Sequence, residues 1–308
     1  MPLEKKIKVP VIVGPTGAGK TSLALRVAAE TGSEILSCDS RQIYRYMNIG
    51  TAKPSLEEMA RVRHWMIDII DPDEYYSAFL FAATAAGIIR ERNRKGGRCI
   101  LCGGTGFYFH CLKNGMGPQC EQDRHLRKKY EKMVREYGPE SIFKELKKVD
   151  PETAGKIHPH DVRRNIRALE VFYNTGITKS ELTKQHNPPG DIQFKIFILS
   201  LPRETLYERI NARVHSMADR GLWEEFISLR KKGYDRNAPG MECVGYKELF
   251  DVEEGRRSFS DALDMIKRNT RRYAKRQITW LKHHYKGTII NQSDKACFHA
   301  LKEITRFF

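Results

Sequence analysis

The fold is decided by one stretch of the sequence, Gly14-Pro15-Thr16-Gly17-Ala18-Gly19-Lys20-Thr21. It follows an apolar run at 9–13 and precedes a helical pattern from Ser22, so it connects a predicted strand to a predicted helix. Backbone N–H groups of such a loop surround phosphate oxygens, and the helix N-terminus adds partial positive charge. Lys20 can reach the terminal phosphates, and the Thr21 hydroxyl can bind Mg²⁺. The stretch predicts a polyphosphate site of the kind found in ATP-binding proteins; a glycine-rich turn that binds nothing is the less favoured interpretation.

Strand and helix patterns alternate through the first third of the chain. Strands are expected at 8–13, 34–37, 98–102 and, later, 194–199, with a helix over 77–94. This order predicts a parallel sheet that binds ligands at the carboxyl ends of its strands. We expect an α/β fold, with a P-loop NTPase-like parallel sheet core at 1–118 and 188–308. An all-helical insertion domain is expected to interrupt this core at 119–187, where only helical patterns occur.

Length and composition predict a globular cytoplasmic protein. The chain has 308 residues, of which 40% are hydrophobic, and no apolar run approaches the ~20 residues that cross a bilayer. The first strand begins too early to leave room for a signal peptide. Seven scattered cysteines argue against a disulfide framework. Cys99 and Cys102 lie inside an apolar strand with no second pair at zinc-finger spacing, so no zinc is expected.

The charge of the chain points to a nucleic-acid partner. Lysine and arginine outnumber aspartate and glutamate by 54 to 38, which gives a net charge of +16. Between Ile266 and Gln292 there are eight basic residues and no acidic one. With Ser260 as N-cap, 261–286 reads as one long helix. It could be a solvated basic helix with Ile266, Tyr273 and Trp280 as its core-facing stripe; the lack of acids favours a surface for phosphate backbones.

Two further candidate residues follow predicted strands at the edge that holds the phosphate loop. Asp39 comes after the second strand, where a carboxylate can act as a general base or as a partner of Mg²⁺; the alternative is an ordinary turn aspartate. Thr105 lies in Gly103-Gly104-Thr105-Gly106, after the third strand. These glycines are expected to let the backbone approach a ligand closely. No aspartate follows the third strand to hold Mg²⁺ for ATP hydrolysis, so the loop need not serve an ATPase.

Several sequence blocks resemble those of the tRNA dimethylallyltransferases, also called tRNA isopentenyltransferases, and they occur in the same order as in that family. Besides the phosphate loop, the blocks lie at 38–44, 48–54, 103–108, 163–171, 243–247 and 270–280. The resemblance extends from the first strand to the basic helix. The zinc-finger extension of eukaryotic relatives is absent, so the chain resembles the bacterial type. Gly17 and Ala18 stand where Ala-Ser is usual, and Met241-Glu242 departs from the family pattern.

The resemblance implies transfer of a dimethylallyl group from dimethylallyl diphosphate to N6 of the adenosine 3′-adjacent to the anticodon in tRNA, with release of diphosphate. The phosphate loop, residues 14–21, would then hold the diphosphate, with Mg²⁺ on Thr21 as cofactor. Lys20 and the family-assigned Arg213 would neutralise the leaving group. Asp39 would accept the proton of the attacking amine, and Thr105 would position the amine or the diphosphate. The target adenine would have to be extruded from the anticodon loop.

The resemblance also implies a long set of tRNA contacts at the anticodon stem-loop. They correspond here to Asp39, Ser40, Arg41, Gln42, Thr105, Arg127, Arg163, Arg164, Asn165, Ile166, Arg167, Glu242, Cys243, Val244, Gly245, Tyr246, Lys247, Lys275, Arg276, Gln277, Ile278, Thr279, Trp280, Leu281 and Lys282. A solvated basic face is the alternative for the arginines of 163–167. No membrane partner is expected, and the enzyme is expected to be a monomer.

Three other functions were weighed. A P-loop nucleotide kinase would bind ATP, but it would need neither the helical insertion nor the acid-free basic helix. An adenylate isopentenyltransferase would perform the same chemistry on a free nucleotide, against which the tRNA-contacting blocks argue. A non-catalytic RNA-binding module would use the loop as a switch, an option weakened by Asp39 and Thr105 at the strand ends.

Overall fold

The chain forms two compact units, which are described separately. The computed structural model describes residues 6–115, 123–185, 187–291 and 294–308. One unit, the core, comprises Met1–Lys113 and Gly190–Phe308, and the other, the helical unit, comprises Asn114–Pro189. The expected boundary between residues 118 and 119 lies outside the described residues. The second division falls two positions after the expected one, at Gly190.

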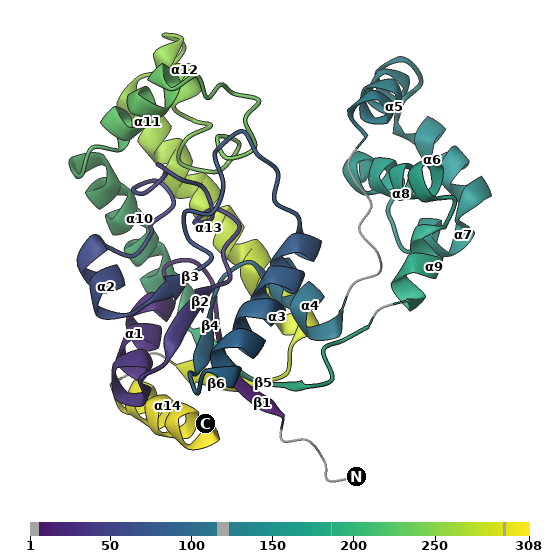
Figure 1. Ribbon diagram of the computed structural model, residues 1–308. Helices are drawn as coiled ribbons and strands as arrows, with labels where there is room; N and C mark the ends of the chain where they lie inside the picture. Colours follow the sequence, from purple (N-terminus) through teal and green to yellow (C-terminus); the bar gives the residue numbers. More distant parts are fainter. Residues whose placement is uncertain (1–5, 116–122, 186, 292–293) are drawn as a thin grey trace, which may run out of the picture. The chain divides into compact units, whose positions relative to one another are not determined.

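The core is built on a six-stranded sheet with strand order β3-β2-β4-β1-β5-β6 (Figure 1). All neighbouring strands are parallel. The strands are β1 (Ile7–Val13), β2 (Glu34–Ser37), β3 (His64–Trp65), β4 (Cys99–Gly103), β5 (Ile192–Ser200) and β6 (Thr288–Asn291). The four expected strands and the parallel sheet are confirmed. The two strands that were not expected, β3 and β6, lie at the sheet edges and are short.

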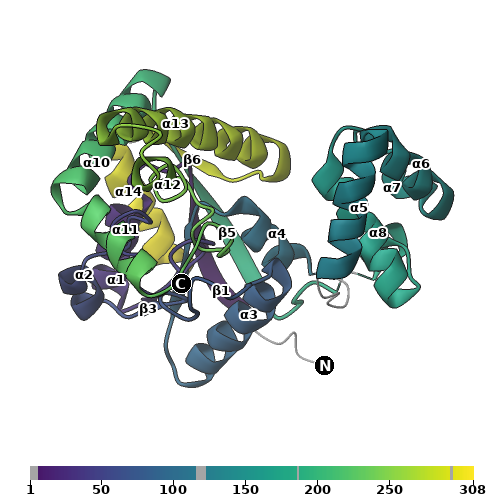
Figure 2. The ribbon, with the colours of Figure 1, turned by 90° about the horizontal axis from the view of Figure 1, so that it is seen from above.

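Helices cover both faces of the sheet, which explains why β1 and β4 are apolar runs without alternation. Their bounds are α1 (Lys20–Thr31), α2 (Leu56–Arg61), α3 (Ala78–Arg94), α4 (Gly106–Asn114), α10 (Arg203–Asp219), α11 (Leu222–Lys231), α12 (Phe250–Glu253), α13 (Phe259–His284) and α14 (Asp294–Phe307). One face packs against α1 and α14, through Leu23 and Ile304 among others. The opposite face packs against α3 and α4, where Phe109 contacts Phe194 edge-on (Figure 2).

The long basic helix is present as α13, with two corrections. It begins at Phe259, because the Ser258 side chain accepts a hydrogen bond from the backbone N–H of Asp261; Ser260, the expected N-cap, lies inside the helix. It ends at His284. Its buried residues are Ala262, Ile266, Ala274, Gln277 and Leu281. Of the expected heptad stripe only Ile266 is fully buried, because a straight helix drifts about 20° per seven residues.

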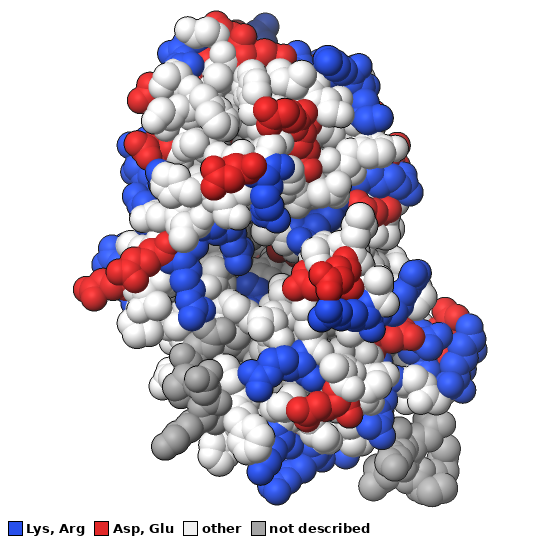
Figure 3. Space-filling model, turned by 90° about the vertical axis from the view of Figure 1, so that its left-hand side faces the viewer, with Lys and Arg blue, Asp and Glu red and all other residues white. Residues whose placement is uncertain are grey.

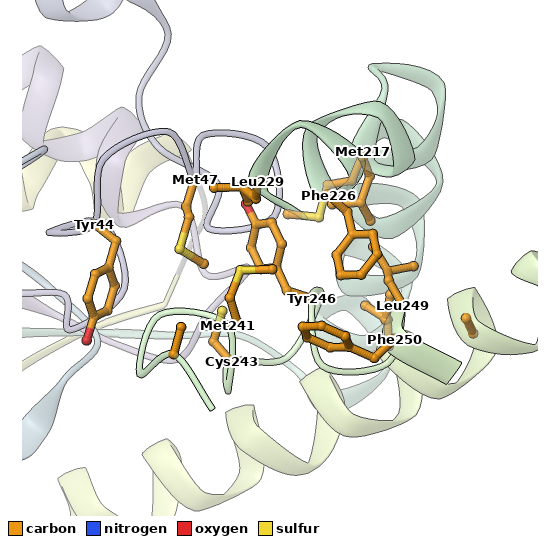
Figure 4. Close-up of a cluster of buried hydrophobic side chains, with 14 of the residues drawn as sticks. Tyr44, Met47, Met217, Phe226, Leu229, Met241, Cys243, Tyr246, Leu249 and Phe250 are labelled. Atoms are coloured by element: carbon orange, nitrogen blue, oxygen red, sulfur yellow. The ribbon is translucent and has the colours of Figure 1, made fainter. Parts of the chain in front are cut away.

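A second hydrophobic cluster lies above the carboxyl edge of the sheet, between α10, α11, α12, α13 and two loops (Figure 4). Phe226 packs edge-on against Phe250, and Tyr246 is fully buried beside them. Met47 and Met241 bring the loops at 43–54 and 238–249 into the same cluster. Two long segments without regular structure are thereby fixed next to the phosphate loop.

The helical unit contains α5 (Arg124–Tyr137), α6 (Pro139–Val149), α7 (Pro151–Ala154), α8 (Val162–Thr175) and α9 (Lys179–Lys184). Its core includes the fully buried Tyr130, Ile142 and Leu169. Gly138 and Gly176 end α5 and α8 with positive φ angles of 79° and 71°, as expected for these breaks. No helix among the described residues of the whole chain is long and apolar enough to cross a membrane.

Candidate active site

A cavity of about 290 Å³ opens at the carboxyl edge of the sheet. Figure 3 shows a hollow in one face of the molecule, with both basic and acidic side chains around it. Residues from widely separated segments line the cavity: Thr16, Gly17, Gly19, Lys20, Thr21, Ser22, Ala24, Ile35, Ser37, Asp39, Gln42, Thr51, Ala52, Pro54, Glu58, His64, Cys102, Gly103 and Arg213. The structure therefore brings together the phosphate loop, Asp39 and Arg213.

The phosphate loop has the backbone that its glycines predict. Gly17 and Gly19 both have φ of 83°, and α1 begins directly after Gly19. Five of the eight loop residues line the cavity, whereas Gly14, Pro15 and Ala18 are buried beneath it. The loop thus presents the N-terminus of a twelve-residue helix and a lysine to the cavity, an arrangement suited to phosphate groups.

Lys20 is held inside the loop by its own backbone. Its Nζ donates to the carbonyl oxygen of Pro15 at 2.9 Å. Burial lowers the pKa of Lys20 to about 8, and the Asp39 carboxylate opposes this shift. An anionic ligand in the cavity would favour the charged ammonium.

Asp39 and Thr105 are brought together by the pairing of β2 with β4. The backbone N–H of Thr105 donates to the Cys38 carbonyl at 3.1 Å, and the Thr105 hydroxyl accepts from the Ser40 N–H at 2.9 Å. Asp39 stands between these contacts, and its Oδ1 accepts from the Arg41 N–H at 2.8 Å. Among the described residues, Asp39 and Gly103 belong to the cavity lining but Thr105 does not.

The glycines after β4 have a different role from the expected one. A Cβ atom on Gly104 would lie 2.4 Å from Nε2 of Gln277, and one on Gly106 would lie 2.2 Å from Cδ1 of Trp280. The space beside these two glycines is filled by α13, so the prediction that they make room for a ligand is wrong. Gly103 does line the cavity. A Cβ atom on Gly103 would lie 2.1 Å from the Cys38 carbonyl oxygen, so glycine is needed here to avoid that clash.

Arg213 reaches the phosphate loop from α10. Its Nη1 donates to the Thr16 hydroxyl at 3.3 Å, and the side chain lines the cavity. Burial lowers the pKa of Arg213, while Asp39 opposes the shift. Lys20 and Arg213 thus place two cationic side chains beside the loop, in a cavity that Asp39 and Glu58 also line.

The three residues after Asp39 hold loops together. Gln42 accepts from the Ser37 hydroxyl at 2.9 Å and donates to the Ala52 carbonyl at 3.1 Å. Nη1 of Arg41 donates to the Pro239 carbonyl at 3.0 Å, which ties it to the segment before residue 242. Ser40 contacts Thr105 as described above. The side chains of Ser40, Arg41 and Gln42 therefore all make hydrogen bonds within the protein.

The block at 242–247 is partly core and partly surface. Cys243, Gly245 and Tyr246 are buried, Val244 is partly buried, and Glu242 and Lys247 are exposed. The Tyr246 hydroxyl donates to Glu225, and it accepts from the Gly50 N–H at 3.1 Å. Only the exposed positions of this block present side chains to a partner.

The α13 block divides in the same way. Lys275, Arg276, Thr279 and Lys282 are exposed, Ile278 and Trp280 are partly buried, and Gln277 and Leu281 are buried. Tyr273, which the family blocks include but no site prediction named, lies beside the Thr105 side chain. Burial and the nearby Asp39 raise the pKa of Tyr273 to about 12.

In the helical unit, the predicted arginines differ in their surroundings. Arg127 donates to both carboxylate oxygens of Glu170, at 2.6 and 3.1 Å, and Arg167 donates to one of them at 2.9 Å. Arg163 and Arg164 are exposed, and Arg164 pairs with Asp161 at 3.2 Å. The remaining two positions, Asn165 and Ile166, are buried. The Asn165 amide donates to two backbone carbonyls, which gives it a structural role.

Sequence reasoning missed Glu225. Its carboxylate accepts from the backbone N–H groups of Asn48, Ile49 and Gly50 at 2.8 to 3.1 Å, and from Tyr246. It fixes the start of the loop that supplies Thr51 and Ala52 to the cavity. No motif surrounds Glu225, and only the tertiary fold reveals this contact.

Comparison with known proteins gives one consistent answer. The family model described as IPP transferase matches residues 42–284. A tRNA dimethylallyltransferase of Thermotoga maritima is 44% identical over 285 residues, covering 92% of each chain. One of Thermosipho africanus is 42% identical over 98% of this chain and 99% of its own. The structure resembles the tRNA isopentenylpyrophosphate transferase of Bacillus halodurans, with TM-score 0.72, 36% identity and coverage of 98% and 97%. It also resembles a eukaryotic dimethylallyltransferase acting on tRNA, with TM-score 0.79, 28% identity and coverage of 94% and 75%.

Proposed function

The chain belongs to the IPP transferase family, and on that premise we propose that its cavity holds an allylic diphosphate while Asp39 receives the amine of the acceptor base. The protein is a prenyltransferase that modifies tRNA. We infer dimethylallyl diphosphate as donor, N6 of the adenosine 3′ of the anticodon as acceptor, and a cytoplasmic monomer as the working form. One observation carries this proposal: the phosphate loop, Lys20, Arg213 and Asp39 line a single cavity.

The diphosphate end of the donor fits the loop. N–H groups at the start of α1 and the cations of Lys20 and Arg213 meet there, so the charge that develops on a leaving diphosphate is stabilised. Thr21 and Asp39 both line the cavity and offer the oxygen ligands that Mg²⁺ prefers. When bound, Mg²⁺ would supply further positive charge beside the leaving group.

The transfer itself requires one bond to form and one to break. The N6 amine of adenine attacks the allylic carbon, the carbon–oxygen bond to the diphosphate breaks, and the amine loses a proton. Asp39 is the proton acceptor, and the backbone N–H of Arg41 fixes the orientation of its carboxylate. The protein contributes mainly by orienting the two substrates toward each other.

The RNA is expected to bind through exposed basic side chains of both units. On the core they are Lys247, Lys275, Arg276 and Lys282, and on the helical unit Arg163 and Arg164. An adenine inside a folded anticodon loop must leave the stack before it can reach Asp39. Because phosphate contacts release counterions, tRNA affinity should fall steeply with salt.

One experiment tests the proposed reaction. The protein is incubated with Mg²⁺, dimethylallyl diphosphate and undermodified tRNA, and the digested nucleosides are identified by mass spectrometry. We expect N6-dimethylallyladenosine and an equal amount of diphosphate. Its absence, together with ATP-dependent phosphate transfer, would establish a nucleotide kinase instead. Modification of free AMP but not of tRNA would establish an adenylate prenyltransferase.

A further inference from the structure

We propose that Gln277 is a positioning residue that holds the phosphate loop against the end of β4, rather than a contact to RNA. It lies in the basic helix α13, between exposed neighbours that are expected to bind tRNA. Its own side chain is buried, with 7% of its surface exposed. The effect expected on turnover rests on the proposed function, whereas the effect expected on anion binding does not.

Both ends of the Gln277 amide are used inside the protein. Oε1 accepts from the backbone N–H of Thr16 at 2.8 Å, and Nε2 donates to the carbonyl oxygen of Gly104 at 2.8 Å. These partners lie 261 and 173 positions away in the sequence. A contact between this amide and a base would break one of these bonds and leave a partly buried backbone group of Thr16 or Gly104 without its partner. The amide therefore connects the phosphate loop to the segment after β4 that carries Thr105.

Thr16 is fixed from two helices. Gln277 of α13 accepts a hydrogen bond from the Thr16 backbone N–H, and Arg213 of α10 donates one to the Thr16 hydroxyl. The next residue, Gly17, has a positive φ and lies against α10, where an added Cβ would be 3.2 Å from Ile210. Because the Thr16 N–H points to Gln277, phosphate oxygens must be bound by N–H groups later in the loop. Gln277 thereby sets which loop amides face the ligand.

The same face of α13 also contacts Thr105 and Gly106, on the side of the site where the acceptor base is expected to bind. Tyr273, one turn before Gln277, lies beside Thr105, and Trp280 packs over Gly106. Lys275 and Thr279 are exposed on the side of the helix away from these contacts; Arg276 is also exposed, but its guanidinium lies over the Tyr273 ring, 5.8 Å from the centroid. The inner face of α13 thus contacts both the phosphate loop and the segment of Thr105 and Gly106. Its outer face is basic. Losing the Gln277 contacts should alter the position of the loop relative to Asp39 without changing the outer face.

The test compares Gln277→Met, which keeps the size of the side chain but neither hydrogen bond, with Lys275→Met on the outer face. Inorganic pyrophosphate affinity is measured by calorimetry without RNA, tRNA affinity by filter binding at several salt concentrations, and single-turnover rate with both substrates saturating. For Gln277→Met we expect pyrophosphate to bind at least fivefold more weakly and the rate to fall 10- to 100-fold. Its tRNA affinity should stay within twofold, with the same salt dependence. Lys275→Met should show the reverse: weaker tRNA binding, a shallower salt dependence and normal pyrophosphate affinity.

Two results would overturn the proposal. In one, Gln277→Met weakens tRNA binding while pyrophosphate affinity and saturated rate stay normal, which would make Gln277 an RNA contact. In the other, all three quantities stay normal. If Gln277→Met does not fold, as judged by its thermal transition, Gly104→Ala decides, because its methyl group would displace Nε2, 2.4 Å away. Gly87→Ala is the control, since nothing lies within 4 Å of the added atom.

Failure of the proposed reaction would be recognised separately. If wild-type protein forms no prenylated nucleoside but Gln277→Met still loses pyrophosphate affinity, the positioning role stands and the reaction is wrong. If the wild type prenylates tRNA and the variant binds pyrophosphate normally and turns over at the normal rate, the reaction stands and the positioning role is wrong.

Discussion

The ammonium group of Lys20 donates a hydrogen bond to the carbonyl oxygen of Pro15, five residues earlier in the same loop, at 2.9 Å. This contact satisfies one of its three donors while the side chain is buried, and burial lowers its pKa to about 8. A cation with a pKa this close to neutrality is unusual for lysine, whose ordinary value is near 10.5. The protonation of Lys20 therefore couples anion binding to pH.

Pyrophosphate affinity should fall as the pH rises through 8. Below this pH Lys20 is charged and attracts the anion; above it the free protein loses that proton, and binding must restore it. With a pKa of about 8, the charged fraction, and with it the affinity, falls about tenfold between pH 7 and pH 9. Calorimetry without added Mg²⁺ in buffers of different ionisation enthalpy should show proton uptake at pH 8.5. Lys20→Met should bind weakly and lack this uptake; equal uptake in both proteins would assign it to another group.

Asp39→Asn should abolish turnover but preserve RNA binding. The amide can still accept from the Arg41 N–H, so the local geometry is kept, but it cannot take the proton of the acceptor amine. We expect the single-turnover rate to fall by about 10²- to 10⁴-fold, with tRNA affinity within threefold of the wild type. Asp219→Asn, at the exposed end of α10, is the control and should turn over normally. Loss of tRNA binding with a normal saturated rate would make Asp39 a recognition residue.

The catalytic edge of the sheet was predictable because its signals are local. The glycine pattern requires the left-handed backbone at Gly17 and Gly19, and strand ends in a parallel sheet meet at one edge. Asp39 and the loop could therefore be placed together without a structure. Arg213 was different: nothing in its own segment distinguishes it from a surface arginine, and the family resemblance alone pointed to it.

Other features depend on tertiary contacts that the sequence pattern does not show. Gln277 stands between Arg276 and Lys282 in a basic helix, which is typical of an RNA-binding face, yet its side chain points inward to Thr16. The glycines at 104 and 106 have the composition of a ligand loop, but their small size serves the packing of α13. The edge strand β6 has four residues and pairs only with β5, too short a pattern to separate from a loop.

Glu225→Gln should destabilise the core and loosen the loop at 48–50. The carboxylate accepts three backbone N–H groups, and an amide in its place turns a donor toward them. We expect the free energy of unfolding to fall by about 1–3 kcal/mol, because charge-assisted hydrogen bonds from three backbone N–H groups are lost. The neighbouring Glu224→Gln, on an exposed side chain, should change it by less than about 0.5 kcal/mol. Urea denaturation measures both; equal stability of the two variants would contradict the anchoring role.

Glu170→Gln should loosen the helical unit. Its fully buried carboxylate pairs with Arg127 and Arg167, whose side chains are 25% and 31% exposed. Removing the charge takes away the carboxylate that pairs with both arginines, at a cost of about 2–4 kcal/mol, less than for a fully buried triad because water reaches both guanidinium groups. Amide hydrogen exchange in α5 and α8 should accelerate. Glu152→Gln is the matched control, since Glu152 also pairs with two cations, Lys156 and Lys184, but at the surface, and should leave exchange almost unchanged.

Two further variants, Arg127→Ala and Arg163→Ala, decide what Arg127 contributes to RNA binding. If the charge of Arg127 is committed to Glu170, then Arg127→Ala should weaken tRNA binding only together with faster exchange in α5, as Glu170→Gln does. Arg163→Ala, at an exposed position, should weaken tRNA binding and reduce its salt dependence while exchange stays normal. If Arg127→Ala instead lowers tRNA affinity with wild-type exchange rates, Arg127 contacts the phosphate backbone directly, and Glu170 serves to orient it toward the RNA.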